Sequence, residues 1–407
     1  MGFSQPVVAV AVTEAKMMKA TNKHLLLLTG AALSIPAPGL AGNVPEKSVI
    51  SYQTAHYKED SLEPNKNVTG GPADRYEISV NKFSLLTPVG DNATVSFDVL
   101  HETLSGASPW FNSESSNGSP VTTMSGASIA EQRNEMAVKL TQFKDAETHS
   151  VGLVNSQEND YSAQAFSYDY AIDLSKKNTT LSTGVSFSND RIFPNQSTPL
   201  HQNSLEGIDT DKKTIQSVYF GVSQNINVRM IGKLGVSHTQ LSGYLSDPYK
   251  LFDRRPDSRT QTVLSAGLRY FSSGHQAAYH LDYRYYEDDW GVRSDTLAFK
   301  TYINLQNKWQ IAPGLRYYSQ HGADFYSPFI PTGSSVGNDY HSEDFRLSFY
   351  GAVSYQLDVY KKLDNYRLKF SIERYESDMS YSQSNPAYNN PGLINFTMTS
   401  IGIDYYF

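Results

Sequence analysis

The chain has 407 residues, no cysteine and a formal net charge of −7, and a charge of this sign argues against nucleic acid as a partner. Its mean hydropathy of −0.45, with no long apolar run after the N-terminal region, excludes a helical membrane protein. Only 18% of the residues are charged, whereas 12% are aromatic. This balance is typical of a transmembrane β-barrel, whose strands alternate apolar and polar faces, and it also suits a secreted soluble all-β protein.

Residues 1–41 predict an N-terminal extension followed by an export signal. Several lysines precede the apolar run 25–28, and Gly39-Leu40-Ala41 supplies small residues at a cleavage position. A basic region, a short apolar region and a small-x-small site together form a secretory signal peptide. We therefore expect export through the Sec pathway, cleavage after Ala41, and a single barrel domain over 42–407. The alternative is a short buried helix.

The mature chain alternates in polarity with period 2 rather than 3.6. In the segment 277–286, Tyr279 and Leu281 fall on one face, whereas Asp282 and Arg284 fall on the other. About sixteen segments behave in this way, most of them about 10 to 15 residues long, which is enough to cross a bilayer at a tilt. The predicted strands are 48–57, 74–87, 92–105, 132–144, 147–157, 162–174, 178–190, 212–225, 228–243, 258–271, 276–287, 294–305, 308–320, 343–358, 365–376 and 393–407.

Short connections between these strands alternate with long ones. Tight turns are predicted near 144–146 and 306–307, and long loops at 106–131, 191–211 and 321–342. A transmembrane barrel has this pattern, with short periplasmic turns and longer external loops. The sequence therefore predicts an all-β, up-and-down antiparallel transmembrane barrel of about 16 strands with both termini in the periplasm. A soluble sandwich is the alternative, although its strands usually have about 5 to 6 residues.

The last predicted strand runs to the end of the chain. Its alternate positions Ile401, Ile403, Tyr405 and Phe407 are apolar or aromatic. A terminal Phe after such a pattern resembles the signal read by the bacterial barrel-assembly machinery. We therefore expect Tyr405 and Phe407 to act as an assembly signal, and we expect outer-membrane lipid and lipopolysaccharide as further partners.

Four stretches of the chain resemble a bacterial family, domain-of-unknown-function 3570. They are FDVLHETLSGASPWF (Phe97 to Phe111), TMSGASIAEQRNE (Thr123 to Glu135), SQENDYSAQAFSYDY (Ser156 to Tyr170) and NTTLSTGVSFSND (Asn178 to Asp190). The resemblance implies an outer-membrane barrel without an assigned activity. It also implies a link to envelope redox or flavin-transfer proteins, and it supplies no catalytic residues.

The loop after the third predicted strand contains a repeated tetrapeptide. The two copies are Ser105-Gly106-Ala107-Ser108 and Ser125-Gly126-Ala127-Ser128, with Trp110 shortly after the first. Glycine permits tight turns and close approach of another chain. One interpretation is a loop folded into the barrel as a constriction. The other is a pair of matched turns that pack the loop against the rim.

Strand alternation also predicts a set of charged side chains that face the barrel interior. They are Arg133, Glu135, Lys139, Lys233, Arg269, His280, Asp282, Arg284, Lys300, Arg316, Arg346, Arg367, Lys369 and Glu373. A predominantly basic wall favours the passage of anions. The alternative is a set of salt bridges that stiffen the wall without conferring selectivity.

The leading hypothesis from the sequence is a porin-like channel for small polar or anionic solutes, because sixteen strands can enclose an aqueous path. A second is a non-conducting barrel that holds a periplasmic or surface partner of a redox or flavin-transfer system. A hydrolase at the barrel rim is a third, and we expect no enzyme. The motifs HExxH and CxxC are absent, so the sequence predicts no metal centre and no cofactor. Acidic loops such as 287–289 and 339–344 are either solvated, bridged to lipopolysaccharide or sites for Ca²⁺.

Overall fold

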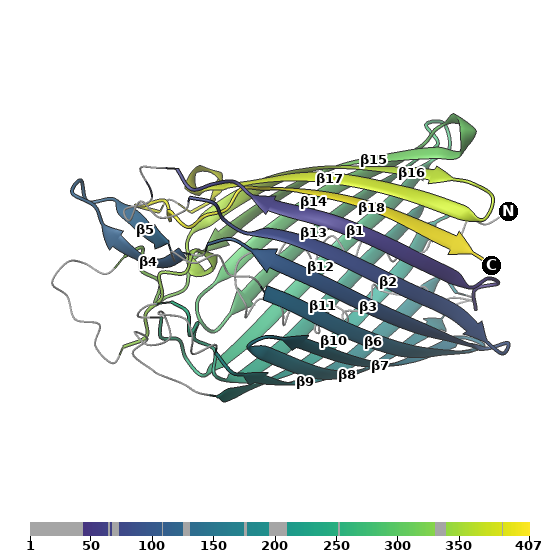
Figure 1. Ribbon diagram of the computed structural model, residues 1–407. Helices are drawn as coiled ribbons and strands as arrows, with labels where there is room; N and C mark the ends of the chain where they lie inside the picture. The colour runs from purple at the N-terminus through teal and green to yellow at the C-terminus, as the bar shows by residue number, and fades with distance from the viewer. Residues whose placement is uncertain are drawn as a thin grey trace.

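The computed structural model describes residues 44–63, 66, 73–107, 109–124, 131–174, 177–194, 210–250, 253–329, 339–384 and 386–407. Sixteen antiparallel strands close into a barrel in which sequence neighbours pair, and β4 and β5 form a separate two-stranded sheet (Figure 1). The predicted up-and-down barrel is confirmed. Within the described ranges, no helix is both long and apolar enough to span a membrane.

Fifteen of the sixteen predicted strands begin and end within three residues of an observed one. The barrel strands are β1 (Val49–Glu59), β2 (Glu77–Val89), β3 (Ala93–Ser105), β6 (Glu131–Lys144), β7 (Glu147–Glu158), β8 (Tyr161–Leu174), β9 (Thr179–Ile192), β10 (Asp211–Asn227), β11 (Met230–Gly243), β12 (Ser258–Ser272), β13 (Ala277–Asp288), β14 (Arg293–Asn304), β15 (Trp309–His321), β16 (Tyr350–Lys362), β17 (Tyr366–Asp378) and β18 (Phe396–Tyr406). The extra hairpin, β4 (Pro109–Glu114) and β5 (Pro120–Met124), lies in the loop between β3 and β6 and was not predicted.

The predicted strand 343–358 is wrong at its start. β16 begins only at Tyr350, and Phe345–Leu347 form the 3₁₀ turn η4. The side chain of Asp344 caps this turn by accepting a hydrogen bond from the backbone N–H of Arg346 at 3.0 Å. Phe345 and Leu347 are both buried rather than turned toward the outside. The first residues of the expected strand therefore form a 3₁₀ turn that buries these two side chains, and the strand itself starts later.

The barrel closes by pairing its first strand with its last. Val49 of β1 lies opposite Tyr406 of β18, and Glu59 lies opposite Phe396. β1 begins and β18 ends at the same end of the barrel, on the right of Figure 1, where the tight turns also lie. Asn307, in one of these turns, adopts a φ of 57°, a conformation that asparagine tolerates better than most residues. The long connections gather at the opposite end, which we call the mouth.

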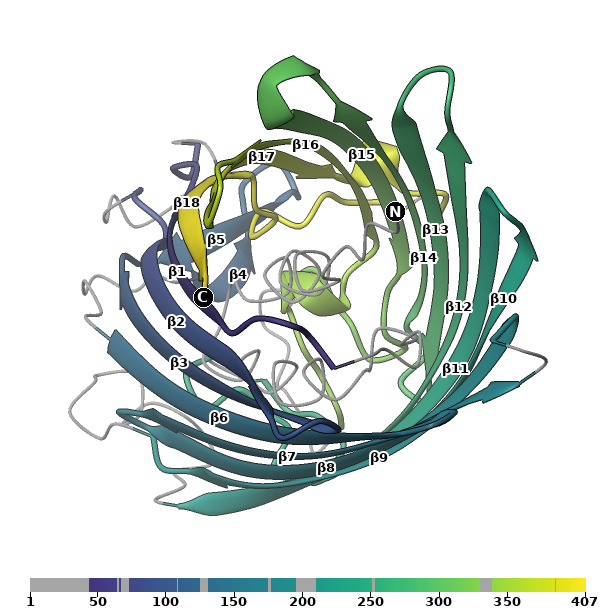
Figure 2. The same cartoon turned by 90° about the vertical axis from the view of Figure 1, so that its right-hand side faces the viewer.

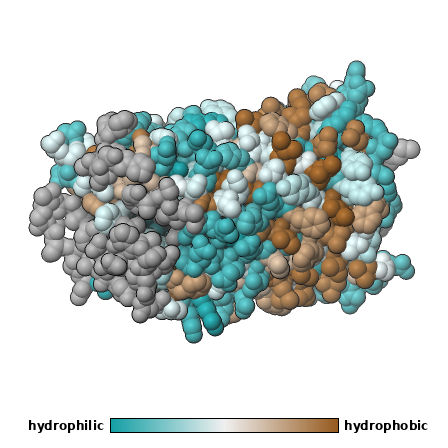
Figure 3. Space-filling view, in the orientation of Figure 1, coloured by the Kyte–Doolittle hydropathy of each residue, from teal (hydrophilic) through white to brown (hydrophobic). Residues whose placement is uncertain are grey.

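The two faces of the wall differ in chemistry. Outward-facing Val138, Leu153 and Ile401 are 44%, 58% and 62% exposed, whereas their inward-facing neighbours are polar or small. Figure 3 shows the apolar side chains as a belt on the half of the barrel nearer the tight turns, with a hydrophilic surface toward the mouth. Period-2 alternation thus separates an apolar exterior from a polar interior.

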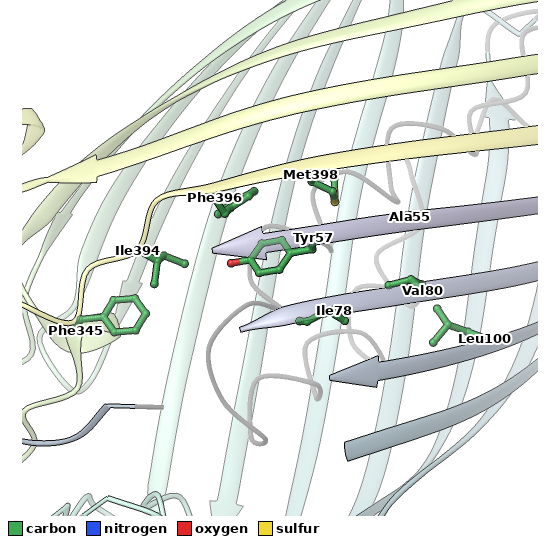
Figure 4. Close-up of a cluster of buried hydrophobic side chains, with 9 residues drawn as sticks. All are labelled: Ala55, Tyr57, Ile78, Val80, Leu100, Phe345, Ile394, Phe396 and Met398. Carbon is green, nitrogen blue, oxygen red and sulfur yellow. The ribbon is translucent and has the colours of Figure 1, made fainter. Parts of the chain in front are cut away.

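One part of the interior is apolar. Side chains from β18, β1, β2 and β3 pack there against two residues of the mouth loops (Figure 4). This seam cluster consists of Ala55, Tyr57, Ile78, Val80, Leu100, Phe345, Ile394, Phe396 and Met398. It lies where the first and last strands meet, and it holds η4 against the inner wall.

Candidate functional site

The predicted interior charges on the strands lie on the face opposite the exposed apolar side chains. On β6, Arg133 and Glu135 are 3% and 8% exposed, whereas Met136 and Val138, which follow them and face the other way, are 55% and 44% exposed. The same alternation places the following residues inside the barrel: Lys139 on β6, Lys233 on β11, Arg269 on β12, His280, Asp282 and Arg284 on β13, Lys300 on β14, Arg316 on β15, and Arg367, Lys369 and Glu373 on β17.

Arg346 does not belong to this set, contrary to the prediction. It lies in η4, outside every strand, because β16 begins four residues later. Its guanidinium pairs with Asp344 and lies 3.5 Å from Asp247 in the loop between β11 and β12. Arg346 is therefore a residue of the mouth.

Many interior charges are neutralised by ion pairs. Near the mouth, Arg133 pairs with Glu102 of β3 at 3.2 Å and with Glu135 on its own strand. Nearer the tight turns, Lys139 pairs with Asp169 of β8 at 2.9 Å. These pairs fit the interpretation that interior charges stiffen the wall.

At the closing seam, one carboxylate joins three strands. Asp404 of β18 is almost fully buried and accepts a hydrogen bond from the Ser51 hydroxyl of β1 at 2.7 Å. Its oxygens also lie 2.9 Å from Arg367 Nε and 2.5 Å from Lys369 Nζ on β17. Asp404 was not singled out from the sequence, although it shares the inward face of its strand with Gly402.

The inner face of β11–β15 forms what we call the basic wall. Away from the mouth it carries five basic residues and one carboxylate: Lys233, Arg269, Arg284, Lys300, Arg316 and Asp282. Arg269 pairs with Asp282 at 2.6 Å, and Lys300 reaches Asp358 of β16 at 2.5 Å. Among the described residues, Lys233 and Arg316 have no carboxylate within 4.0 Å. Pairing therefore neutralises only part of this wall.

The loop with the repeated tetrapeptide forms the β4–β5 hairpin at the mouth. Ser105 ends β3, and Gly106 has a φ of 120° and packs so closely that a Cβ there would lie 2.3 Å from the carbonyl oxygen of Arg75. Ala107 is buried, and the Trp110 ring meets Phe111 edge-on at 5.1 Å. Ser108 and the second copy, Ser125-Gly126-Ala127-Ser128, lie outside the described residues. Figure 1 shows the hairpin beyond the strand ends, and Figure 2 shows it to one side of the barrel axis.

A different loop approaches the axis. Seen along the barrel in Figure 2, the turn around η4 lies near the middle of the ring. Phe345 places it there by inserting into the seam cluster, where it packs with Ile394 and the strand residues. This insertion could not be predicted, because Phe345 and Leu347 would share one face with Val353 if β16 continued through them, and they therefore resemble an extension of its apolar face. The acidic run just before them, which lacks alternation, was the available signal.

A set of polar contacts joins four connections across the mouth, and we call it the mouth network. Asp344 accepts a hydrogen bond from Arg255 Nη2 at 2.8 Å, and Arg255 pairs with Asp253 at 2.8 Å. The Asn112 backbone N–H of β4 donates to the Glu343 carboxylate, and Asn390 donates to the Glu343 carbonyl at 3.0 Å. Burial alone would raise the pKa of Asp344, but nearby Arg346 and Arg255 outweigh it and hold that pKa well below its usual range.

The acidic loops show no metal site. In the part of the chain that the structure describes, no group of three or more His, Asp or Glu side chains has a geometry that could hold a metal ion. Asp288, the last residue of β13, accepts a hydrogen bond from Arg259 Nε at 2.9 Å.

A family described as "Protein of unknown function (DUF3570)" matches residues 25–397, nearly the whole chain. The chain belongs to this family. The four stretches that resembled DUF3570 in sequence thus lie in a true member, folded as a barrel. No curated protein matches this DUF3570 chain.

Several solved structures are similar to this DUF3570 member. CdiB from Acinetobacter baumannii shares 7% identity over 89% of this chain and 60% of its own, with a TM-score of 0.49. A bacterial polysaccharide outer membrane secretin shares 10% over 88% and 98%, with a TM-score of 0.47. OccK11 (OpdR) from Pseudomonas aeruginosa shares 9% over 89% and 97%, with a TM-score of 0.42. The chain thus spans about three fifths of the length of CdiB.

Proposed function

We propose that this DUF3570 barrel is a bacterial outer-membrane channel that lets small polar or anionic solutes diffuse. The observation that carries the proposal is the wall of sixteen strands, apolar on the outside and charged on the inside. Eight strands leave room only for side chains, whereas sixteen can enclose water. A charged inner face far from lipid is what a water-filled path requires.

The apolar belt supports an orientation in the membrane. Because the belt lies nearer the tight turns, we assign that end to the periplasm and the mouth to the cell exterior (Figure 3). The hydrophilic surface toward the mouth would then meet lipopolysaccharide. Export through Sec with cleavage after Ala41 remains a prediction, because it falls on residues outside the described ranges.

The channel is tested by electrical recording from the purified mature barrel in a planar bilayer. We expect stepwise conductance increases as single barrels insert, because the interior is polar and charged. The control is the same preparation after heat denaturation, which destroys the barrel and should give no steps. Correctly folded protein that inserts without any conductance would contradict the proposal.

The mouth network favours one alternative, a sealed barrel that holds another protein. Four connections joined by buried and partly buried hydrogen bonds present a structured surface at this end of the barrel. A stoichiometric partner that co-purifies with a non-conducting barrel would support this scaffold role, with a periplasmic or surface protein of a redox or flavin-transfer system as partner. We propose no enzymatic activity for either form.

Deleting Phe407 is expected to lower the amount of folded barrel in the outer membrane several-fold. The residue exchanges two backbone hydrogen bonds of 3.0 Å with Ser48, and its exposed ring stacks on Tyr405 at 5.7 Å. Its loss weakens the closing edge and removes the expected signal for the assembly machinery. The measurement is the heat-modifiable band in outer-membrane fractions. Phe370→Ala, which removes another exposed ring within β17 (39% exposed, against 53% for Phe407), is the matched control and should assemble nearly as the wild type does.

A further inference from the structure

Four of the five cations of the basic wall fall into two kinds, and the fifth, Arg284, lies over the Tyr286 ring at 5.7 Å. Arg269 and Lys300 each lie within ion-pair distance of a carboxylate, Asp282 and Asp358 respectively. Lys233 and Arg316, on the outer strands β11 and β15 of the same wall, have no such partner among the residues that the structure describes. Glu373 on β17 is buried and attracts both Arg316 and Lys300, but it forms no ion pair within 4.0 Å with either of them. The wall is therefore left with an excess of positive charge at two places.

Glycine makes the pairing on this wall possible. Gly267 faces inward between Lys233 and Asp282, and a Cβ there would lie 2.9 Å from Asp282 Oδ1 and 3.4 Å from Arg269 Nη1. The Arg269–Asp282 pair consequently lies flat over Gly267, close to the stem of Lys233, whose Cβ lies 3.6 Å from the same point. The stem of Lys233 thus lies beside an ion pair whose charges cancel, and no carboxylate among the described residues lies within 4.0 Å of its ammonium.

The opposite wall lacks this excess. At a comparable distance from the tight turns, Lys139 of β6 is paired with Asp169 of β8. The inward residues around that pair are small, and they include Gly152 and Gly184. At this distance from the tight turns, the cations without a carboxylate within 4.0 Å therefore lie on the basic wall and not on β6–β9.

We propose that Lys233 and Arg316 are anion-binding residues, at which the carboxylate or phosphate group of a solute takes the place of the missing protein carboxylate. An ammonium attracts such a group as a point charge, and a guanidinium also matches its oxygens with two parallel N–H donors. That a bound anion then passes through the barrel rests on the proposed channel function. Binding itself does not depend on conduction. Arg269 and Lys300 already have carboxylate partners, so they are not part of this site.

Ion selectivity tests the site with variants of opposite expected sign. The reversal potential across a KCl gradient gives the permeability ratio of chloride to potassium. Lys233→Gln and Arg316→Gln should each lower this ratio several-fold, and Asp282→Asn should raise it by uncovering Arg269. The double variant Arg269→Gln with Asp282→Asn removes a neutral pair from the same wall and should leave the ratio near the wild-type value. If the barrel conducts but the permeability ratio is the same in Lys233→Gln, Arg316→Gln and the wild type, the anion-binding site is refuted. The channel function would then still hold.

Equilibrium binding tests the site without relying on conduction. The probes are citrate and inorganic phosphate, titrated by calorimetry into the detergent-solubilised barrel at low ionic strength. We expect binding that weakens by roughly tenfold or more when both Lys233 and Arg316 become Gln, since a charge-assisted hydrogen bond contributes that much. The double variant Lys139→Gln with Asp169→Asn should bind as the wild type does. Binding to a barrel that does not conduct would retain the site and reject the channel. Failure of both probes to bind the wild type would overturn the site.

Discussion

Replacing Phe345 with alanine is expected to release the loop between β15 and β16 from the inner wall. The ring is 5% exposed and packs in the seam cluster, and a Phe→Ala change at such a position costs about 3–5 kcal/mol. The cost falls on docking of the loop, because the strands around the cluster keep their ladder hydrogen bonds. We therefore expect faster proteolysis within the loop and a larger single-channel conductance, with little change in the temperature at which the barrel unfolds.

Tyr340→Ala is the matched control for this change. Tyr340 lies in the same loop, but its ring is exposed and contributes nothing to the seam cluster. It should leave both the proteolysis rate and the conductance unchanged. If Phe345→Ala and the wild type are cleaved at equal rates, the loop is held by other contacts, and the mouth network is the next candidate.

Replacing Asp404 with alanine is expected to have the largest effect on the stability of the barrel itself. The change leaves Arg367, Lys369 and the Ser51 hydroxyl without their common acceptor. Breaking a buried ion pair by removing one partner costs about 3–5 kcal/mol, and the lower figure applies here because both cations are partly exposed. The variant should lose its compact form on unheated gels at a clearly lower temperature than the wild type does.

The control for Asp404 is another aspartate in an ion pair. Asp364 lies in the turn before β17, its side chain is 97% exposed, and it pairs with Lys308 at 3.2 Å. Exposed pairs of this kind contribute about 0–1 kcal/mol, so Asp364→Ala should unfold at nearly the wild-type temperature. Equal unfolding temperatures for both variants would show that the seam does not depend on its buried carboxylate.

Strand positions and strand faces could be predicted from the sequence because each depends on neighbours in the chain. The alternation of Tyr279, Asp282 and their neighbours already separates outside from inside, and a single-layer wall offers no other place for the two sets. Length then distinguishes a membrane-crossing strand from that of a sandwich. The hairpin β4–β5 was not predicted because its strands are too short to match this length and lie within a long loop.

Asp282, Asp358 and Glu373 could be predicted as candidate partners of the interior cations, but which cation each one pairs with depends on register between strands and could not. Lys300 of β14 pairs with Asp358 of β16, two strands away, by extending over Gly314 of β15, where a Cβ would lie 3.5 Å from Lys300 Cγ. Nothing in the local pattern around Lys300 selects Asp358 over the other interior carboxylates. The insertion of Phe345 escaped for a related reason, since its contacts come from both ends of the chain.

The seam cluster also constrains the order in which the barrel folds. Its side chains come from β1, β2 and β3 near the start, from β18 at the end and from η4 in between. Contacts of such large sequence separation form slowly, because the entropy of closing a long loop is lost before any contact compensates for it. This apolar patch must therefore remain uncovered until the last strand has been synthesised and can pair with the first. A chaperone that protects this patch from aggregation would have to bind the cluster residues of β1–β3 before those of β18 are available.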